Sequence, residues 1–358
     1  MKFSDIGTRV ASKDFLSYQL VAELSHRGRM RAFFLWGLLL ISLHPSPISA
    51  QWWQESQAIM GTRVLVELWH PDEAQGRAAV GAVMDEMRRI DREMSPFKAS
   101  SLLSYMNREA ARSPVEITPE LFELMWESVR ISELTGGAFD VTFASAGRKY
   151  DYRKHVKPDH EALAEAMPAI DYHHLQFDRQ HTRIRYLHRG VYVDLGGIAK
   201  GHAVDRAIGI LQKRGITQAM VGAGGDTRII GDRRGEPWVV GVRDPRKEGE
   251  NVAVLPLTDV AVSTSGDYER YFELDGVRYH HIIDPKTGDS AREVRSVTVL
   301  GDEATTTDAL STSVFVLGVE KGLALVNRLP GIDAIIIDGE GRMHFSDELL
   351  RMAKHDPS

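Results

Sequence analysis

The spacing of apolar residues predicts a series of short strands interrupted by a few long helices. Apolar residues alternate in "GTRVLVELW", which predicts a strand from Thr62 to Trp69. Apolar residues three and four positions apart predict helices over 72–94 and 119–134, with Thr118 as the N-cap of the second and Pro119 at its first position. Further strands are expected at 175–177, 184–186, 190–194, 218–222, 239–243, 260–265, 278–283, 296–301 and 333–338.

The order of these elements predicts an α+β fold. Helices fall between only some of the strands, which favours mixed or antiparallel sheets with flanking helices over a regular alternation of strand and helix. The 358 residues, 43% of them hydrophobic, suffice for one large domain or two closely packed ones. The one candidate boundary is the charged turn "RDPRKEGEN" at 243–251.

The N-terminal region has the layout of a secretory signal peptide. Arg31 precedes an apolar run over 32–43, and a proline-containing stretch leads to the small residue Ala50. An apolar core of this length is too short to span a bilayer comfortably, so we expect export to the periplasm, with a retained membrane anchor as the alternative.

The start of the chain is unusual because about thirty residues precede the apolar run, far more than an ordinary leader has. We interpret residues 1–29 as a mis-assigned upstream extension and residues 30–50 as the signal peptide, with Met30 as the natural start.

Charge and composition exclude several classes of partner and chemistry. The net charge is -6 and no block of like charges occurs, so we expect no nucleic-acid groove and no polybasic membrane patch. Cysteine is absent, which rules out disulfides, a thiol nucleophile and lipid attachment through cysteine. A metal site would have to use oxygen or imidazole ligands, which favours Mg²⁺ or Ca²⁺ over structural zinc.

Three glycine-rich turns are candidates for binding one polar ligand. In "VDLGGIAKGHAVD" (193–205), glycines join a predicted strand to a helix over 199–211, and Lys200 adds a positive charge. The spacing matches neither the dinucleotide fingerprint nor a P-loop. "VGAGGD" (221–226) and "TGGAFDVT" (135–142) are similar turns. Together they suggest that several backbone segments meet at one ligand, although each alone could be a tight turn.

Two further segments carry candidate chemistry. "TTTDALSTSVFVLG" (305–318) places Asp308 and Thr312 one turn apart on a predicted helix, so that their oxygens share a face and suit a hard cation. The alternative is that Asp308 only caps this helix. The adjacent His280 and His281 identify no function by themselves, but strand alternation should point them to opposite faces, so we expect replacement of His280 to have little effect.

The ordered set of motifs resembles the FAD:protein FMN transferases, the ApbE family. The resemblance covers nearly all of residues 52–345, leaves 346–358 as a C-terminal tail, and implies a T-fold-like, two-lobed single domain. It rests on "MGT" at 60–62 followed by "TGGAFD", "VDLGGIAKGHAVD", "GGD", "TSGDYERYF", "HHIIDPKTG" and "DALST".

The resemblance implies a Mg²⁺-dependent enzyme that cleaves FAD and joins its FMN half, through a phosphoester, to a threonine of a partner flavoprotein, with release of AMP. The partner could be a subunit of a membrane-associated redox complex. His281 is similar to the general base of the family, and Asp284 could orient it. The implied FAD-lining residues are Met60, Ala138, Phe139, Asp140, Asp194, Lys200 and Ile283, and the implied metal ligands are the Gly197 carbonyl, Asp308, Ser311 and Thr312.

Phe97, in "MSPFK", stands where the family usually has a tyrosine. Stacking on a flavin or adenine ring could survive this change, but a hydrogen bond from a phenol could not.

Two other functions use the same pocket. One is a periplasmic FAD-binding or storage protein, and the other is an FAD pyrophosphatase that releases FMN and AMP. The proposed metal ligands argue against simple storage, whereas the sequence leaves transferase and hydrolase open because water and threonine would use the same groups.

Overall fold

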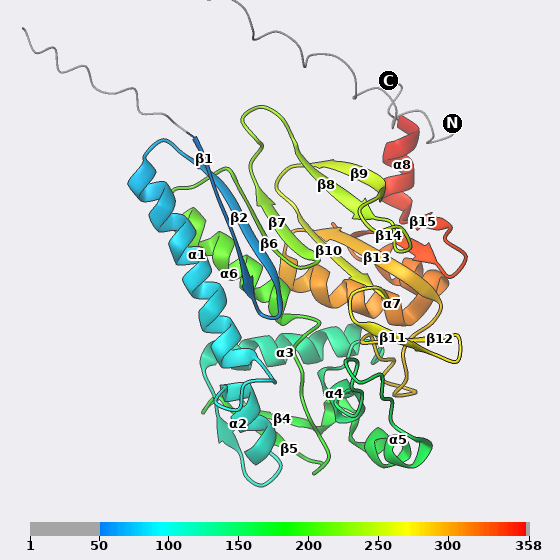
Figure 1. Cartoon of the computed structure of the whole chain (residues 1–358). Coiled ribbons are helices and arrows are strands. Elements are labelled where there is room, and N and C mark those ends of the chain that lie inside the picture. Colours follow the sequence, from blue (N-terminus) through cyan, green and yellow to red (C-terminus); the bar gives the residue numbers. More distant parts are fainter. Residues whose placement is uncertain (1–50, 356–358) are drawn as a thin grey trace, which may run out of the picture. The chain divides into compact units, whose positions relative to one another are not determined.

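The computed structural model describes residues 51–355. Its central element is an eight-stranded antiparallel sheet (Figure 1). The expectations for residues 1–29 and 30–50 lie outside these described residues. The order of the strands is β1-β2-β6-β7-β10-β13-β14-β15. Their bounds are Gln51–Ile59, Thr62–His70, Ala219–Ala223, Asp226–Ile230, Ala261–Gly266, Val294–Gly301, Asp333–Asp338 and Met343–Phe345.

Three long helices, α1 (Glu73–Met94), α6 (Ala199–Lys213) and α7 (Ala304–Val326), cover one face of this sheet (Figure 1). The predicted periodicity explains their orientation, because the apolar positions of α1 and α6 are the buried ones. The side chain of Asp72 caps α1 by accepting a hydrogen bond of 2.8 Å from the Gln75 amide. Within residues 51–355, α7 is the one helix long and apolar enough to cross a membrane, but more than half of that stretch is buried in the protein core.

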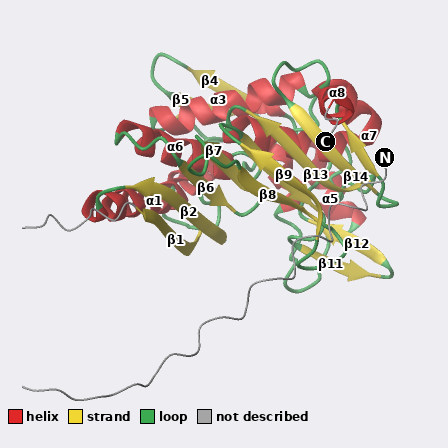
Figure 2. Ribbon diagram, turned by 90° about the horizontal axis from the view of Figure 1, so that it is seen from above, coloured by secondary structure: helices red, strands yellow, loops and turns green. Residues whose placement is uncertain are grey.

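The hairpin of β8 (Trp238–Arg243) and β9 (Asn251–Leu257) lies on the side of the sheet opposite these helices (Figure 2). A cavity of about 190 Å³ separates β8 from Thr227, Thr264 and Thr298 of the sheet. The charged turn at 243–251 connects these two strands, so the domain boundary considered there is wrong: residues 51–355 belong to one compact unit.

The remaining elements lie between α1 and α6 in sequence, apart from the hairpin of β11 and β12, which forms a separate sheet, and the C-terminal helix α8. Leu121 and Ile184 belong to the same buried cluster as Val64 of the large sheet, whereas Phe272 and Tyr279 of the hairpin belong to a separate small cluster. The bounds of these elements are α2 Leu102–Glu109, α3 Pro119–Leu134, α4 Ala144–Gly147, α5 His160–Ala166 and α8 Asp347–His355; β3 Val115–Glu116, β5 Arg183–Tyr186 and β4 Leu175–Asp178 in one sheet; and the hairpin of β11 Tyr271–Leu274 and β12 Val277–His280. Short 3-10 turns are at Val141–Phe143, Met167–Ala169 and Tyr172–His174.

The structure confirms most of the predicted elements and the α+β class. Thr118 caps α3 through the Leu121 amide, as expected. The segment 346–358, expected as a tail, contains α8.

The predicted strand at 190–194 is wrong, because this segment pairs with no strand of the described chain. Its backbone groups bond instead to the Asn107 side chain, at both the amide and the carbonyl of Val193, to the Ser145 hydroxyl and to the Val141 carbonyl. Because these partners satisfy its backbone groups, the partly buried segment needs no sheet.

Candidate active site

The three glycine-rich turns predicted to share a ligand meet in the structure. A Cβ placed on Gly197 would lie 3.2 Å from the ring of Phe139, so "GGIAKG" and "TGGAFD" are in contact. The Lys200 ammonium lies 2.7 Å from the carboxylate of Asp226, the last residue of "VGAGGD". The prediction that these segments converge is confirmed.

A buried cluster of one lysine and two carboxylates forms the centre of the site. Lys200 Nζ lies 3.2 Å from both oxygens of Asp308, in addition to its bond with Asp226. Burial alone would lower the pKa of Lys200, but the two carboxylates raise it above its usual range, so the ammonium stays charged. Burial, together with the charge of Asp226, raises the pKa of Asp308, because Lys200 offsets only part of this cost.

Asp308 lies in the second turn of α7, where it is 2% exposed, so it does not cap its own helix. It caps α6 instead: its Oδ2 accepts a hydrogen bond of 3.0 Å from the Gly201 amide. Gly201 allows this contact because a Cβ there would lie 2.1 Å from the Ala304 carbonyl oxygen. The alternative that Asp308 is only the N-cap of α7 is therefore wrong.

The residues that the family resemblance implies as metal ligands lie together and offer oxygen only. Thr312 Oγ1 is 3.2 Å from the Cβ position of Gly197, and Ser265 bonds to the hydroxyls of Ser311 (2.8 Å) and Thr312 (3.3 Å). One carboxylate, two hydroxyls and a nearby backbone carbonyl suit a hard cation that keeps water and phosphate as its other ligands. Within residues 51–355 no group of three or more His, Cys, Asp or Glu side chains is arranged to hold a metal ion.

His281 follows β12 directly, and its amide donates a hydrogen bond of 3.1 Å to the carbonyl of Arg270. This bond extends the β11–β12 pairing by one position, so the two side chains lie on the same face. The ring nitrogen Nδ1 of His281 is buried and has no hydrogen-bond partner among the described residues. Burial lowers the pKa of His281 to about 3, and the positive charge of Arg270 adds to this, so the ring is neutral and able to accept a proton.

His280 lies in the core, where it is 3% exposed and packs edge-on against Phe315. Its Nε2 donates a hydrogen bond of 2.6 Å to the Ala291 carbonyl, and its Nδ1 accepts one of 3.3 Å from the Ile282 amide. His280 therefore connects the turn before Ala291 to the Phe315 side of α7, and these contacts argue against the expectation that it could be replaced with little effect.

Three of the residues implied to line the FAD site lie in strained or tightly bonded backbone. Met60 has a positive φ of 56° in the two-residue turn between β1 and β2. Asp194 accepts a hydrogen bond of 2.8 Å from the Gly196 amide, and its own amide bonds to Val141. Both oxygens of the buried Asp140 are occupied by Thr142 and the Tyr172 amide, so an FAD contact from Ala138–Asp140 would come from the backbone or from Phe139.

Ile283 and Phe97, two further candidates for the FAD site, differ in exposure. Ile283 is buried in a small cluster with Tyr150, Phe272 and Tyr279, whereas Phe97 is 80% exposed in the loop between α1 and α2. An exposed phenyl ring in a loop is free to stack on a planar ligand. The Asp284 carboxylate accepts a hydrogen bond from the Lys286 amide, and this bond stabilises the turn after His281.

Sequence reasoning missed the roles of Asp226 and Arg270. Asp226 was visible only as a carboxylate that ends a glycine-rich turn, and the pairing with Lys200 depends on how β7 packs on α6. Arg270 is exposed, and its guanidinium has no ion-pair partner among residues 51–355 although it faces His281. A cation left unpaired beside a neutral histidine is a signal that only the structure shows.

The fold and the site together define a single-domain α+β protein whose glycine turns, lysine and oxygen ligands suit a phosphate-bearing molecule and a hard cation. The chain belongs to the ApbE family, whose profile matches residues 60–336.

Relatives named FAD:protein FMN transferase include one from Treponema pallidum, 32% identical over 82% of this chain and 86% of the relative, and one from Vibrio cholerae, 34% identical over 68% and 75%. Among solved structures, the ApbE protein from Thermotoga maritima superposes with a TM-score of 0.78 at 37% identity, and the flavin transferase ApbE from Vibrio cholerae with 0.76 at 30%. The alignment covers 84% of this chain and 99% of each of these two chains.

Proposed function

We propose that this protein is an FAD:protein FMN transferase that requires Mg²⁺, attaches FMN through a phosphoester to a threonine of an acceptor flavoprotein, and releases AMP. The observation that carries the proposal is the meeting of Lys200, Asp226 and Asp308 with three glycine-rich turns, within a chain of the ApbE family. Curated relatives named for this reaction support the choice of substrate.

The backbone and Lys200 would bind the pyrophosphate of FAD. In the first turn of α6, the Gly201 amide donates to Asp308 and the Ala199 amide to the Leu195 carbonyl, so the Lys200 amide, which has no partner among the described residues, would be the donor to a phosphate oxygen. The ammonium of Lys200 carries the positive charge that the departing AMP phosphate needs when the bridging P–O bond breaks. Asp226 holds this ammonium at the end of the turn and keeps it protonated.

His281 would take the proton from the acceptor threonine. Its neutral ring meets the first requirement of a general base, but a pKa near 3 is low for that task. The negative charge of a bound pyrophosphate would offset Arg270 and raise the pKa of His281. The base would thereby gain strength when the substrate is in place.

A Mg²⁺ ion would be held by the Asp308 carboxylate, the hydroxyls of Ser311 and Thr312, and the Gly197 carbonyl. When bound, it supplies charge neutralisation at the phosphate. Asp308 already has Lys200 as a counter-ion, so the lysine would shift toward Asp226 and the substrate as the cation takes its place on Asp308.

The test is to incubate the purified protein with FAD, Mg²⁺ and a candidate acceptor flavoprotein. Flavin fluorescence on the acceptor band of a denaturing gel and free FMN in solution are followed separately. The proposal predicts fluorescence on the acceptor, its loss when the target threonine is replaced by alanine, and one AMP per FMN transferred. Free FMN without labelled acceptor would indicate the pyrophosphatase, and FAD recovered intact would indicate storage; either result would overturn the proposal.

We also propose that the protein is exported and acts in the periplasm. The signal-like segment over residues 30–50 supports this. N-terminal sequencing of the protein from a periplasmic fraction should find a mature N-terminus near Gln51, and a start upstream of Met30 would contradict it.

A further inference from the structure

Helices α6 and α7 lack N-caps of their own, and each is capped by the other. Neither Ile198, before α6, nor Glu303, before α7, makes a side-chain capping bond. Asp308 of α7 accepts from the Gly201 amide at the start of α6. In return, Asp205 of α6 accepts from the amides of Ala304 and Thr305 at the start of α7, at 3.0 and 2.8 Å.

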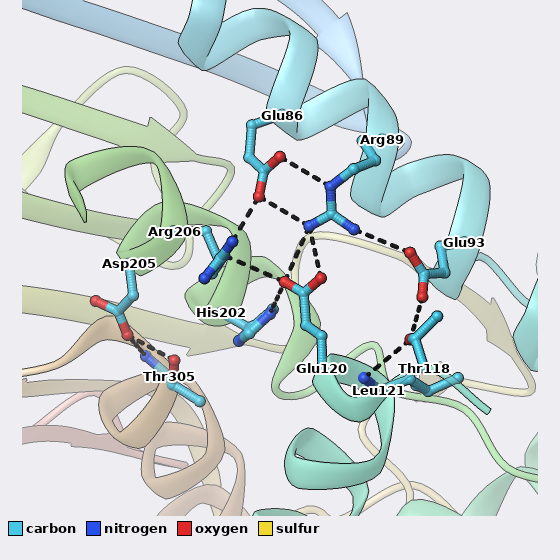
Figure 3. A network of polar contacts seen from close by, with 10 residues as sticks. All are labelled: Glu86, Arg89, Glu93, Thr118, Glu120, Leu121, His202, Asp205, Arg206 and Thr305. Carbon is cyan, nitrogen blue, oxygen red and sulfur yellow. Dashed lines mark hydrogen bonds and ion pairs between the residues drawn. The ribbon is translucent and has the colours of Figure 1, made fainter. Parts of the chain in front are cut away.

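Both carboxylate oxygens of Asp205 are used in hydrogen bonds or ion pairs. Its Oδ2 also accepts from the Thr305 hydroxyl at 2.5 Å, and its Oδ1 pairs with the Arg228 guanidinium at 2.6 Å (Figure 3 shows the bonds to Thr305). The side chain of Asp205 is 15% exposed, and Arg228 lies two residues after Asp226 on β7. Strand β7 therefore binds α6 twice, at Lys200 through Asp226 and at Asp205 through Arg228.

On its other side, α6 is bound to helices α1 and α3 by a network of hydrogen bonds and ion pairs. His202 bonds to Glu120 of α3 at 2.9 Å, and Glu120 pairs with Arg89 of α1 and with Arg206 (Figure 3). The hydrogen bond from His202, together with these cations, lowers the pKa of Glu120 to about 2, so this carboxylate stays charged. Helix α6 is thus a fixed support, and the start of α7 takes its position from Asp205.

We propose that Asp205 is a positioning residue for the cation site, because it sets the first turn of α7 and thereby the distance of Asp308, Ser311 and Thr312 from Gly197. Asp205 touches neither the reacting atoms nor the metal ligands. The proposal rests on the function proposed above, and it assigns a task to the last residue of "VDLGGIAKGHAVD".

The test compares Asp205→Ala with Asp72→Ala, which removes a side-chain cap from α1, where no site residue lies nearby. Thr305→Val is a milder third variant that removes one donor and keeps both amides and the carboxylate, so the series stays informative even if Asp205→Ala folds poorly. Three quantities are measured: the Mg²⁺ concentration for half-maximal FMN transfer, the upward shift of the thermal midpoint caused by Mg²⁺ with FAD present, and the affinity for FAD without Mg²⁺.

Asp205→Ala should raise the half-saturating Mg²⁺ concentration by about tenfold or more, the usual scale for a residue that orients metal ligands. It should reduce the Mg²⁺-induced thermal shift and leave FAD affinity within about twofold of wild type. Thr305→Val should act in the same direction but less, and Asp72→Ala should lower the thermal midpoint without changing the Mg²⁺ requirement.

Equal Mg²⁺ requirements in the Asp205→Ala and Asp72→Ala proteins would overturn the inference, as would a parallel loss of Mg²⁺ and FAD binding in Asp205→Ala alone. If the transfer rate and the thermal midpoint of the wild-type protein do not change with Mg²⁺, the cation site itself is refuted, and with it the Mg²⁺ requirement proposed above. The two failures are therefore distinguishable.

Discussion

Gly201 is the position at which the contact between α6 and α7 can be tested most directly. A Cβ at Gly201 would lie 2.1 Å from the carbonyl oxygen of Ala304 and 2.8 Å from the Cβ of Asp308. Contacts below 3.0 Å do not occur for real Cβ atoms, and a backbone carbonyl cannot rotate out of the way as a side chain can. In the Gly201→Ala protein, the two helices would therefore have to separate by roughly 1 Å at this point.

Two terms of opposite sign determine the stability of this variant. Alanine in a helix interior is favoured over glycine by about 0.5–1 kcal/mol. Overpacking costs about 1–3 kcal/mol, and stretching the hydrogen bond from the Gly201 amide to the charged Asp308 costs up to about 1.5–3 kcal/mol more. The costs outweigh the gain, so we expect a net loss of about 1–5 kcal/mol in the free energy of unfolding.

Gly209 is the matched control. It lies in the same helix, but no atom is within 4 Å of its Cβ position, so Gly209→Ala should gain about 0.5–1 kcal/mol. Urea unfolding followed by circular dichroism measures both variants, and FMN transfer at increasing Mg²⁺ reports the cation site. Gly201→Ala should also need more Mg²⁺, because Asp308 moves with α7. If both variants gain stability and transfer FMN like wild type, the close contact does not exist as described and the reasoning is refuted.

Other predictions concern the site itself. Asp308→Ala should abolish Mg²⁺-dependent turnover and leave weakened but measurable FAD binding, because it removes the one carboxylate among the proposed ligands; full activity in Mg²⁺ would refute the assignment. His281→Ala should lower the turnover rate by about a hundredfold or more at nearly unchanged FAD affinity, and a large loss of affinity instead would make His281 part of the pocket wall. His280→Ala should cost about 2–4 kcal/mol in unfolding free energy, measured in urea, since it deletes a buried ring and its two hydrogen bonds; a wild-type value would contradict its placement. The pKa of His281 is about 3 in the folded protein and about 6.5 in the unfolded chain, so the unfolded state binds more protons below pH 6.5 and stability falls as the pH drops. Between pH 7 and pH 5, the wild type should therefore lose up to about 2 kcal/mol more unfolding free energy than His281→Asn. Equal losses in the two proteins would show that the His281 ring titrates normally.

The sequence by itself determined the elements whose signals are local. Helices α1 and α3 form where apolar residues repeat at helical spacing, and the capping residue Thr118 stands directly before its helix. The glycine-rich turns could also be identified as possible ligand-binding segments, because a positive φ or a close approach of the backbone favours glycine at that position of the sequence. The motif order also predicted the family.

Tertiary structure decided the features that depend on bonds between distant segments. The segment 190–194 has the composition of a strand, yet Asn107, more than eighty residues earlier in the chain, satisfies its backbone, so no sheet forms there. Likewise, the alternation of His280 and His281 was readable, but that His280 is enclosed by Ala291 and Phe315 was not. Asp205 and Asp308 look like ordinary helix residues in the sequence, and they become reciprocal caps only because Gly201 lets α6 and α7 approach closely, a contact between residues about a hundred positions apart that no local pattern encodes.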